Sequence, residues 1–189
     1  AKFAQQQGTL LVAAAGNEAA DWDGAGSYVF FPRDMPGVIG VAATAPMECW
    51  ALDPTVDLDW PAPYTDYGQR VIDLAAPGGK LVGTPLEAVK LGELTLPACV
   101  FDMVLSTSSC FGPAREFEKQ GTWNYASGTS LAAPHVAGVA ALVIQANLGL
   151  LTPAQIRTIL QQSADDLGKP GNDDYYGAGR VNALRAVLQ

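Results

Sequence analysis

Three continuous apolar runs stand out along the chain, and they predict strands that are buried on both faces. The runs are residues 9–15 (TLLVAAA), 38–44 (VIGVAAT) and 71–76 (VIDLAA), and turn residues follow the first and the third. Such runs are typical of the central strands of a parallel sheet, because helices cover both faces of that kind of sheet. We therefore expect an α/β fold in three layers, with a mostly parallel β-sheet flanked by helices.

Four further segments carry the periodicity or the end signals of helices. Thr152 and Pro153 form a strong helix start, because threonine caps a first turn and proline fits the first helical position. The helices are expected at residues 1–7 (closed by Gly8), 130–147, about 152–164, and after the capping residue Asn182. The first helix has no N-cap, so the sequence is expected to start inside an element.

Residues 79–121 fit this pattern less well, because they mix Gly, Pro, Lys and Glu with short apolar runs. We expect a long excursion with a hairpin, since a structureless loop of that length is unusual in a compact domain. Cys99 and Cys110 lie in this excursion and are close enough in sequence to pair, which would leave Cys49 over. Alternatively, all three cysteines are reduced and packed as small apolar residues.

Composition narrows the function classes. A chain of 189 residues, 49% of them hydrophobic, is long enough to bury the core of one domain. The formal net charge of −8 argues against a nucleic-acid partner, which needs a basic face. The longest uncharged stretch, residues 120–156, is interrupted by Asn, Gln, His and Pro, so no membrane span is predicted. No targeting segment is visible at the start.

The most specific string of the chain is SGTSLAAPHVAG at residues 127–138. A Gly-rich turn here delivers Ser130 to the first turn of a buried helix. Free backbone N–H groups and the positive end of the helix dipole then lie beside its hydroxyl, which favours a developing oxyanion. Pro134 is expected within the first turn, where its missing N–H costs nothing.

This string resembles the active-serine signature of the subtilisin-like serine peptidases, the subtilases of peptidase family S8. Four more blocks resemble segments of the C-terminal part of the subtilase catalytic domain: residues 12–17 (VAAAGN), 31–39, 73–78 (DLAAPG) and 176–182 (YGAGRVN). The resemblance implies that residues 1–189 are the C-terminal portion of such a domain. The fold would be subtilisin-like and incomplete at its N-terminal side, with a family-variable insertion at about 79–121.

The resemblance implies two catalytic roles. Ser130 would be the nucleophile that attacks the scissile carbonyl and forms an acyl-enzyme. Asn17 would donate a side-chain N–H to the oxyanion, together with the backbone N–H of Ser130.

The resemblance also implies how a polypeptide substrate would be held. Ala14, Ala15 and Gly16 would offer backbone groups to an extended substrate, and Gly128 would lie in the substrate-binding turn before the serine. Phe30 occupies the position of the floor of the primary specificity pocket. A bulky ring there would favour small side chains next to the scissile bond.

The acid and the base of the triad are missing from this chain. In subtilases both precede the serine, the aspartate in an Asp-Ser/Thr-Gly string and the histidine in a His-Gly-Thr-His-like string. The only histidine is His135, which lies about 140° around the helix from Ser130 and is expected to be packed and hydrogen-bonded rather than a base. The sequence argues against an α/β-hydrolase, because that fold needs a histidine well downstream of the serine and none follows His135.

Two readings of the function therefore stay open. In the first, the chain is part of a serine endopeptidase whose Asp and His lie on missing sequence or a second chain, so that the chain alone is inactive. In the second, it is a catalytically inactive peptide-binding domain, although such a domain has no chemical need for the intact Asn17 and serine string. The resemblance also implies secretion.

No cofactor is expected to be required, although structural calcium or sodium is possible in this family. The resemblance suggests a weak cation site formed by the carbonyls of Arg33, Met35 and Val38 with Asp73, but a bonded strand-end aspartate is an equal alternative. The acidic residues Asp165, Asp166, Asp173 and Asp174 do not follow an EF-hand spacing and are expected in a solvated loop. The metal-binding residues are therefore unknown.

Overall fold

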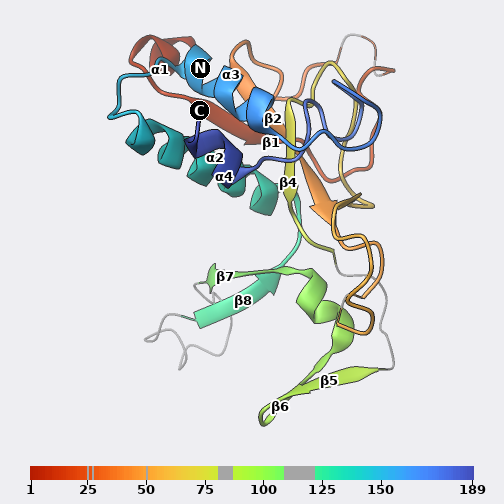
Figure 1. Ribbon diagram of the computed structural model, residues 1–189. Coiled ribbons are helices and arrows are strands. Elements are labelled where there is room, and N and C mark those ends of the chain that lie inside the picture. The colour runs from red at the N-terminus through yellow and green to blue at the C-terminus, as the bar shows by residue number, and fades with distance from the viewer. Residues whose placement is uncertain (25, 27, 50, 81–86, 109–121) are drawn as a thin grey trace.

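The computed structural model describes the whole chain except residues 25, 27, 50, 81–86 and 109–121 (Figure 1). One short helix and four strands form the first part of the described chain, two antiparallel strand pairs follow, and three helices come last. In order, the elements are α1 (Lys2–Gln6), β1 (Leu11–Ala14), β2 (Val38–Ala45), β3 (Trp60–Pro61), β4 (Leu74–Pro77), β5 (Ala88–Leu91), β6 (Leu94–Pro97), the 3-10 helix η1 (Ala98–Asp102), β7 (Val104–Ser108), β8 (Thr122–Ala126), α2 (Thr129–Ala146), α3 (Pro153–Ser163) and α4 (Ala183–Val187).

The central sheet contains the three apolar runs that the sequence predicts as strands. β1 and β4 each pair with β2 in parallel, and the short β3 pairs with β2 antiparallel. Every residue of β2 is buried, as expected for a central strand. The third run becomes a strand only from Leu74, because Val71 and Ile72 lie in the turn that precedes it.

The two faces of the sheet are covered in different ways. Val41 of β2 belongs to a core cluster shared with α2, α3 and α4, whereas its neighbour Ala42 faces a second, smaller cluster. This second cluster is closed by loop residues such as Trp22 and Tyr176. The α/β content is therefore as predicted, but the expected three-layer arrangement is not found, because the second face carries loops in the part of the chain that the structure describes.

The helices begin where the sequence signals predict. Thr152 and Gln155 form a reciprocal capping box at α3, and the Asn182 side chain accepts the N–H of Arg185 at 3.0 Å to start α4. α2 is apolar and long enough to cross a membrane by composition, but it packs on β1, β2 and β4 as a core helix. Pro134 lies beyond the first turn of α2, contrary to expectation, so the Ser130 carbonyl loses its helical N–H partner.

The described part of the 79–121 excursion contains one antiparallel hairpin and one strand that pairs with the segment just after the excursion. β5 pairs with β6, and β7 pairs with β8, which runs directly into the turn before α2. Figure 1 shows both strand pairs extending away from the α/β part of the molecule. The sequence predicts a single hairpin, and the β7–β8 pair was missed because its strands are far apart in sequence.

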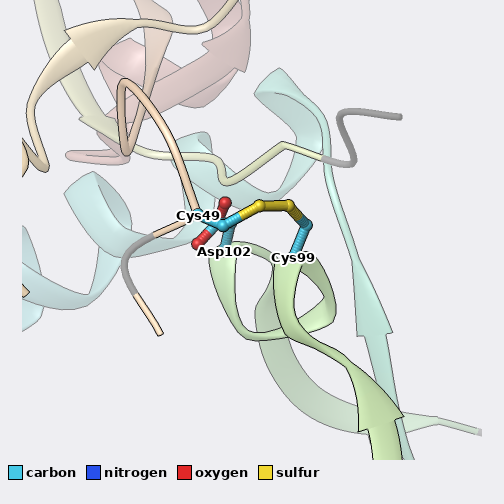
Figure 2. Close-up of side chains that lie close together, drawn as sticks. All are labelled: Cys49, Cys99 and Asp102. Carbon is cyan, nitrogen blue, oxygen red and sulfur yellow. A yellow bond between two sulfur atoms is a disulfide. The ribbon is translucent and has the colours of Figure 1, made fainter. Parts of the chain in front are cut away.

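A disulfide joins Cys49, in the loop after β2, to Cys99 in η1 (Figure 2). Both sequence alternatives are therefore wrong, since Cys99 is neither reduced nor paired with Cys110, which lies outside the described residues. The partner is 50 residues away in sequence, a separation that spacing alone does not favour. The bond ties the hairpin excursion to the sheet, and it makes the two sulfur atoms poor metal ligands.

The acidic residues near the C-terminus are more structured than expected. Asp173 is buried and accepts the backbone N–H groups of Lys169, Tyr175 and Tyr176 at 2.8–3.0 Å. Asp165 forms ion pairs with the guanidinium groups of Arg180 and Arg185. The prediction of a solvated acidic loop is thus wrong for Asp173, which holds the loop together.

Candidate active site

The end of β1 and the start of α2 meet at one point of the molecule. Gly128 donates its backbone N–H to the carbonyl of Gly78, just after β4, at 3.0 Å. This contact fixes the turn that delivers Ser130 to the first turn of α2, where the serine is exposed. The expected position of Ser130 at the N-terminus of a largely apolar helix is therefore found.

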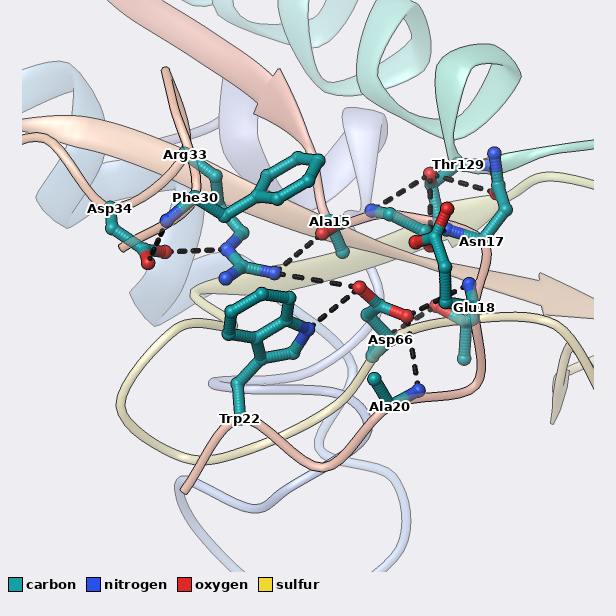
Figure 3. A network of polar contacts seen from close by, with 12 residues as sticks. Ala15, Asn17, Glu18, Ala20, Trp22, Phe30, Arg33, Asp34, Asp66 and Thr129 are labelled. Carbon is teal, nitrogen blue, oxygen red and sulfur yellow. Dashed lines mark hydrogen bonds and ion pairs between the residues drawn. The ribbon is translucent and has the colours of Figure 1, made fainter. Parts of the chain in front are cut away.

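Asn17 binds the same helix end from the loop after β1 (Figure 3). Its Oδ1 accepts the backbone N–H of Thr129 at 2.9 Å and lies 3.0 Å from the Thr129 hydroxyl. The Thr129 hydroxyl in turn accepts the Gly16 N–H at 3.2 Å. Because Oδ1 is engaged in this way, the Asn17 amide must present its Nδ2 donor on the other side.

Ser130 and Asn17 converge over Gly128. A Cβ atom built on Gly128 would lie 3.1 Å from the Ser130 Oγ and 3.7 Å from both terminal atoms of the Asn17 amide. The φ of +149° at Gly128 also disfavours any residue with a side chain. Glycine thus keeps open a small space that borders a hydroxyl and a carboxamide.

The chemistry that this space supports is stabilisation of an anion next to a nucleophile. In the described part of the chain the Ser130 N–H donates to no carbonyl, as expected for the first turn of a helix, where N–H groups lack intrahelical acceptors. That N–H and the Asn17 Nδ2 are two donors beside the Ser130 hydroxyl, at the positive end of α2. An oxygen that gains negative charge during attack by the serine would find both donors in place.

Ala14, Ala15 and Gly16, which are predicted to offer backbone groups to a substrate, differ in whether their N–H and carbonyl groups are already hydrogen-bonded within the protein. Ala15 donates its N–H to Val41 and its carbonyl accepts from the Arg33 guanidinium, so both groups are used internally. Gly16 is likewise engaged, by Thr129 and by the Asp66 N–H. Because hydrogen bonds alternate in a parallel ladder, the backbone groups of Ala14 point to the opposite, open edge of β1. The edge role therefore fits Ala14 and not the other two.

Phe30 is part of an aromatic and charged layer that the sequence did not predict. Its ring lies 5.6 Å from that of Trp22, and the Arg33 guanidinium is 5.1 Å from the Phe30 ring centre and 4.4 Å from the Trp22 ring centre. Figure 3 shows the guanidinium between the two rings. Arg33 is only 2% exposed and Asp66 is fully buried beside it. No local pattern in the sequence around Arg33 or Asp66 points to this layer.

No described side chain is placed as a general base for Ser130. His135 is exposed, so the prediction of a packed histidine is wrong, although its Nδ1 does donate to the Leu131 carbonyl at 2.8 Å. Tyr64 lies near Gly128, but burial raises the pKa of its phenol to about 12. The phenol therefore stays protonated and donates to the Gly79 carbonyl at 2.6 Å.

Protein groups already contact three of the four residues suggested for a cation site. The Asp73 carboxylate accepts the Gly40 N–H at 2.8 Å and forms an ion pair with Arg157. The Val38 carbonyl also faces Arg157, and the Met35 carbonyl accepts the Val38 N–H at 3.1 Å. Because a guanidinium already neutralises Asp73, the alternative of a bonded strand-end aspartate describes this residue.

The sequence of this chain is similar to those of known proteases. The sequence model of the subtilase family matches residues 1–179. An extracellular protease of Xanthomonas campestris is 34% identical over 187 residues, which are 97% of this chain and 24% of that protein. An extracellular basic protease of Dichelobacter nodosus is 33% identical over 184 residues, which are 95% of this chain and 23% of that protein.

A solved structure shares the fold. The crystal structure of a lanthipeptide protease matches 99% of this chain and 52% of its own, with a TM-score of 0.72 and 29% sequence identity. The chain thus spans about a quarter of the length of the two relatives and about half of the length of this protease structure.

Proposed function

The chain belongs to the subtilase family, and from that premise we propose that it is the C-terminal portion of the catalytic domain of a serine endopeptidase. Residues 79–121 would be a family-variable insertion in that domain. The observation that carries the proposal is the convergence of the Ser130 hydroxyl and the Asn17 amide over Gly128.

The proposed reaction is acyl transfer. The Ser130 Oγ attacks the carbonyl carbon of the scissile peptide bond, and its proton passes to a base. The oxygen of that carbonyl becomes an anion and accepts hydrogen bonds from Asn17 Nδ2 and the Ser130 N–H. Collapse of the intermediate releases the amine, which takes the proton, and water then hydrolyses the acyl-enzyme. This chemistry needs no cofactor.

The base and the acid are proposed to lie outside this chain, on a segment that completes the domain. The outer edge of β1 has no strand partner among the residues that the structure covers. Large apolar side chains are also exposed on α2 and α4 and just after α4, among them Leu142, Leu184 and Leu188. An unpaired strand edge and exposed apolar residues favour docking of further structure. Without that segment Ser130 has no base, so the chain alone is proposed to be inactive.

The substrate is proposed to be a polypeptide that binds in extended form at the end of β1, where Ala14 offers its backbone, beyond the part of the edge that the completing segment would cover. Phe30 would then close the pocket next to the scissile bond and select small side chains. Secretion is also proposed, because both relatives are named extracellular proteases and a disulfide is present. Disulfides persist mainly in oxidising compartments.

The proposal is tested on the full-length protein with a fluorophosphonate reagent and a set of peptide amides. We expect covalent labelling of Ser130, located by mass spectrometry of the digested protein, and cleavage of the peptides. Isolated residues 1–189 should give neither result. If the full-length protein binds peptides but neither cleaves them nor reacts with the reagent, the peptide-binding alternative replaces the peptidase.

Substitution of Phe30 with alanine is expected to widen the specificity of the full-length enzyme. Removing the ring should raise kcat/KM about tenfold for substrates with a large aromatic side chain before the scissile bond, relative to substrates with alanine there. The measurement is a kcat/KM series over such side chains. Phe31→Ala is the matched control, because Phe31 is 69% exposed and adjacent. A wild-type preference for large aromatics would contradict the pocket assignment.

A further inference from the structure

The buried carboxylate of Asp66 contacts the loop that carries Asn17, residues 16–22, at several points, in addition to backbone hydrogen bonds that join the loop to Tyr64 and Tyr67. The Oδ1 of Asp66 accepts the backbone N–H groups of Glu18 at 2.9 Å and Ala20 at 3.1 Å, and its Oδ2 accepts the indole N–H of Trp22 at 2.7 Å. The backbone N–H of Asp66 donates to the Gly16 carbonyl at 3.1 Å. Asp66 therefore contacts the loop on both sides of Asn17.

The carboxylate packs closely on the loop at Gly16. A Cβ atom built on Gly16 would lie 2.2 Å from the Asp66 Oδ2, and the φ of +122° at Gly16 excludes most other residues. Asn17 follows immediately, and its Oδ1 is fixed on the N-terminus of α2. A small displacement of residues 16–22 would thus move the Asn17 amide relative to Ser130.

Arg33 completes the arrangement from below the loop. Its guanidinium donates to the Ala15 carbonyl at 2.5 Å and lies 3.8 Å from the Asp66 Oδ2. The Asp34 carboxylate accepts from the Arg33 Nε at 2.6 Å. Burial raises the pKa of Asp34, but the hydrogen bonds from Arg33 and the Phe30 N–H, together with nearby arginine charge, lower it by more, so the net pKa lies below its ordinary value. The Arg33 guanidinium thus lies between the carboxylates of Asp34 and Asp66.

A buried charge pair of this kind contributes little net folding stability. The cost of removing two charges from water offsets most of their attraction, and apolar residues of similar volume often stabilise a protein as well or better. The Arg33 Nη2 also has no hydrogen-bond partner among the described residues. A pair that costs this much and fixes one loop at several points is better explained by the geometry it imposes.

We propose that Arg33 and Asp66 are positioning residues that hold residues 16–22 so that Asn17 Nδ2 faces the oxyanion formed on attack by Ser130. The inference rests on the proposed peptidase function and deepens it. Because Asp66 would act on the reaction through the Asn17 loop, its loss should weaken transition-state stabilisation more than substrate binding, and the loss should not exceed that of Asn17 itself.

The test is a double-mutant cycle in the full-length enzyme with Asp66→Asn and Asn17→Ala. Asparagine keeps one oxygen for Glu18 and Ala20 but turns an NH₂ group toward the Trp22 N–H and removes the charge beside Arg33. We expect Asp66→Asn to lower kcat by about tenfold or more, within the range of an oxyanion donor, with KM nearly unchanged. In the Asn17→Ala background it should lower kcat by less than about twofold.

A milder variant covers the case in which Asp66→Asn does not fold. Trp22→Phe keeps the ring over Arg33 and removes only the hydrogen bond to Asp66, so kcat should fall about fivefold. Asp165→Asn is the matched control, because Asp165 also forms arginine ion pairs but in the C-terminal part of the chain. It should lower the melting temperature and leave kcat unchanged, with enzyme concentrations set by active-site titration in every case.

The outcomes separate the inference from the function beneath it. If Asp66→Asn and Trp22→Phe keep the wild-type kcat, or if their losses multiply in full with that of Asn17→Ala, the positioning role is overturned while the peptidase stands. If the wild-type protein shows no cleavage that depends on Ser130, the proposed function fails and the inference fails with it.

Discussion

Substitution of Ser130 with alanine in the full-length protein is expected to lower kcat by about 10⁶-fold. The magnitude is that of the corresponding substitution in subtilisin, another member of the family. The Ser130 side chain is exposed at the start of α2, and no described hydrogen bond uses its hydroxyl. Removal of the Oγ therefore leaves the helix end intact, and the melting temperature should not change.

The measurement is kcat on a peptide amide together with a thermal melt. Ser106→Ala serves as the control, because Ser106 is exposed on β7 and takes no part in the site. Residual activity of Ser130→Ala within about tenfold of the wild type would show that another nucleophile does the chemistry, since loss of any essential triad member costs far more.

Substitution of Asn17 with alanine is expected to lower kcat by about 10²–10³-fold with little change in KM. This is the range reported by removal of the oxyanion asparagine in subtilisin, and it applies here because Nδ2 is free while Oδ1 is bound to Thr129. The same substitution also removes an acceptor at the start of α2. Loss of such a cap destabilises a protein by about 1 kcal/mol, so the melting temperature should fall as well.

A second variant separates the two effects of Asn17. Asn17→Asp keeps an oxygen that accepts the Thr129 N–H but has no N–H to donate to an oxyanion. We expect its kcat to fall as far as that of Asn17→Ala while its melting temperature stays closer to the wild type. A kcat near the wild-type value in Asn17→Asp would mean that the Asn17 amide acts only as a helix cap.

Local signals explain which parts of this structure the sequence predicts well. The Thr152 capping box, the Asn182 cap and the buried run of β2 each depend on residues close in sequence, and all three are found. The turn before Ser130 is of the same kind, since Gly128 and the helix start lie within one short string. Interactions within a few residues leave a mark in the sequence pattern that propensity and periodicity can detect.

Contacts between distant segments leave no such mark. The Cys49–Cys99 bond and the Arg33–Asp66 pair each join residues more than 30 positions apart, and composition gave no reason to prefer these partners. The internal use of the Ala15 carbonyl follows from Arg33 and was missed for the same reason. Sequence alone likewise could not say that loops close the second face of the sheet, because loops carry weak periodicity.

The buried pair under the Asn17 loop also limits how this domain can be recombined with its relatives. A chimera that receives residues 16–22 from another subtilase keeps Asp66 and Arg33 but can lose Trp22, the residue that contacts both of them. A chimera that exchanges a segment with only one of the two charges leaves the other charge unpaired in the protein interior. Such an unpaired charge destabilises the folded state by about 3–5 kcal/mol. Residues 15–34 and 62–68 should therefore be exchanged together. We expect a chimera between homologues to fold only when both segments come from the same parent.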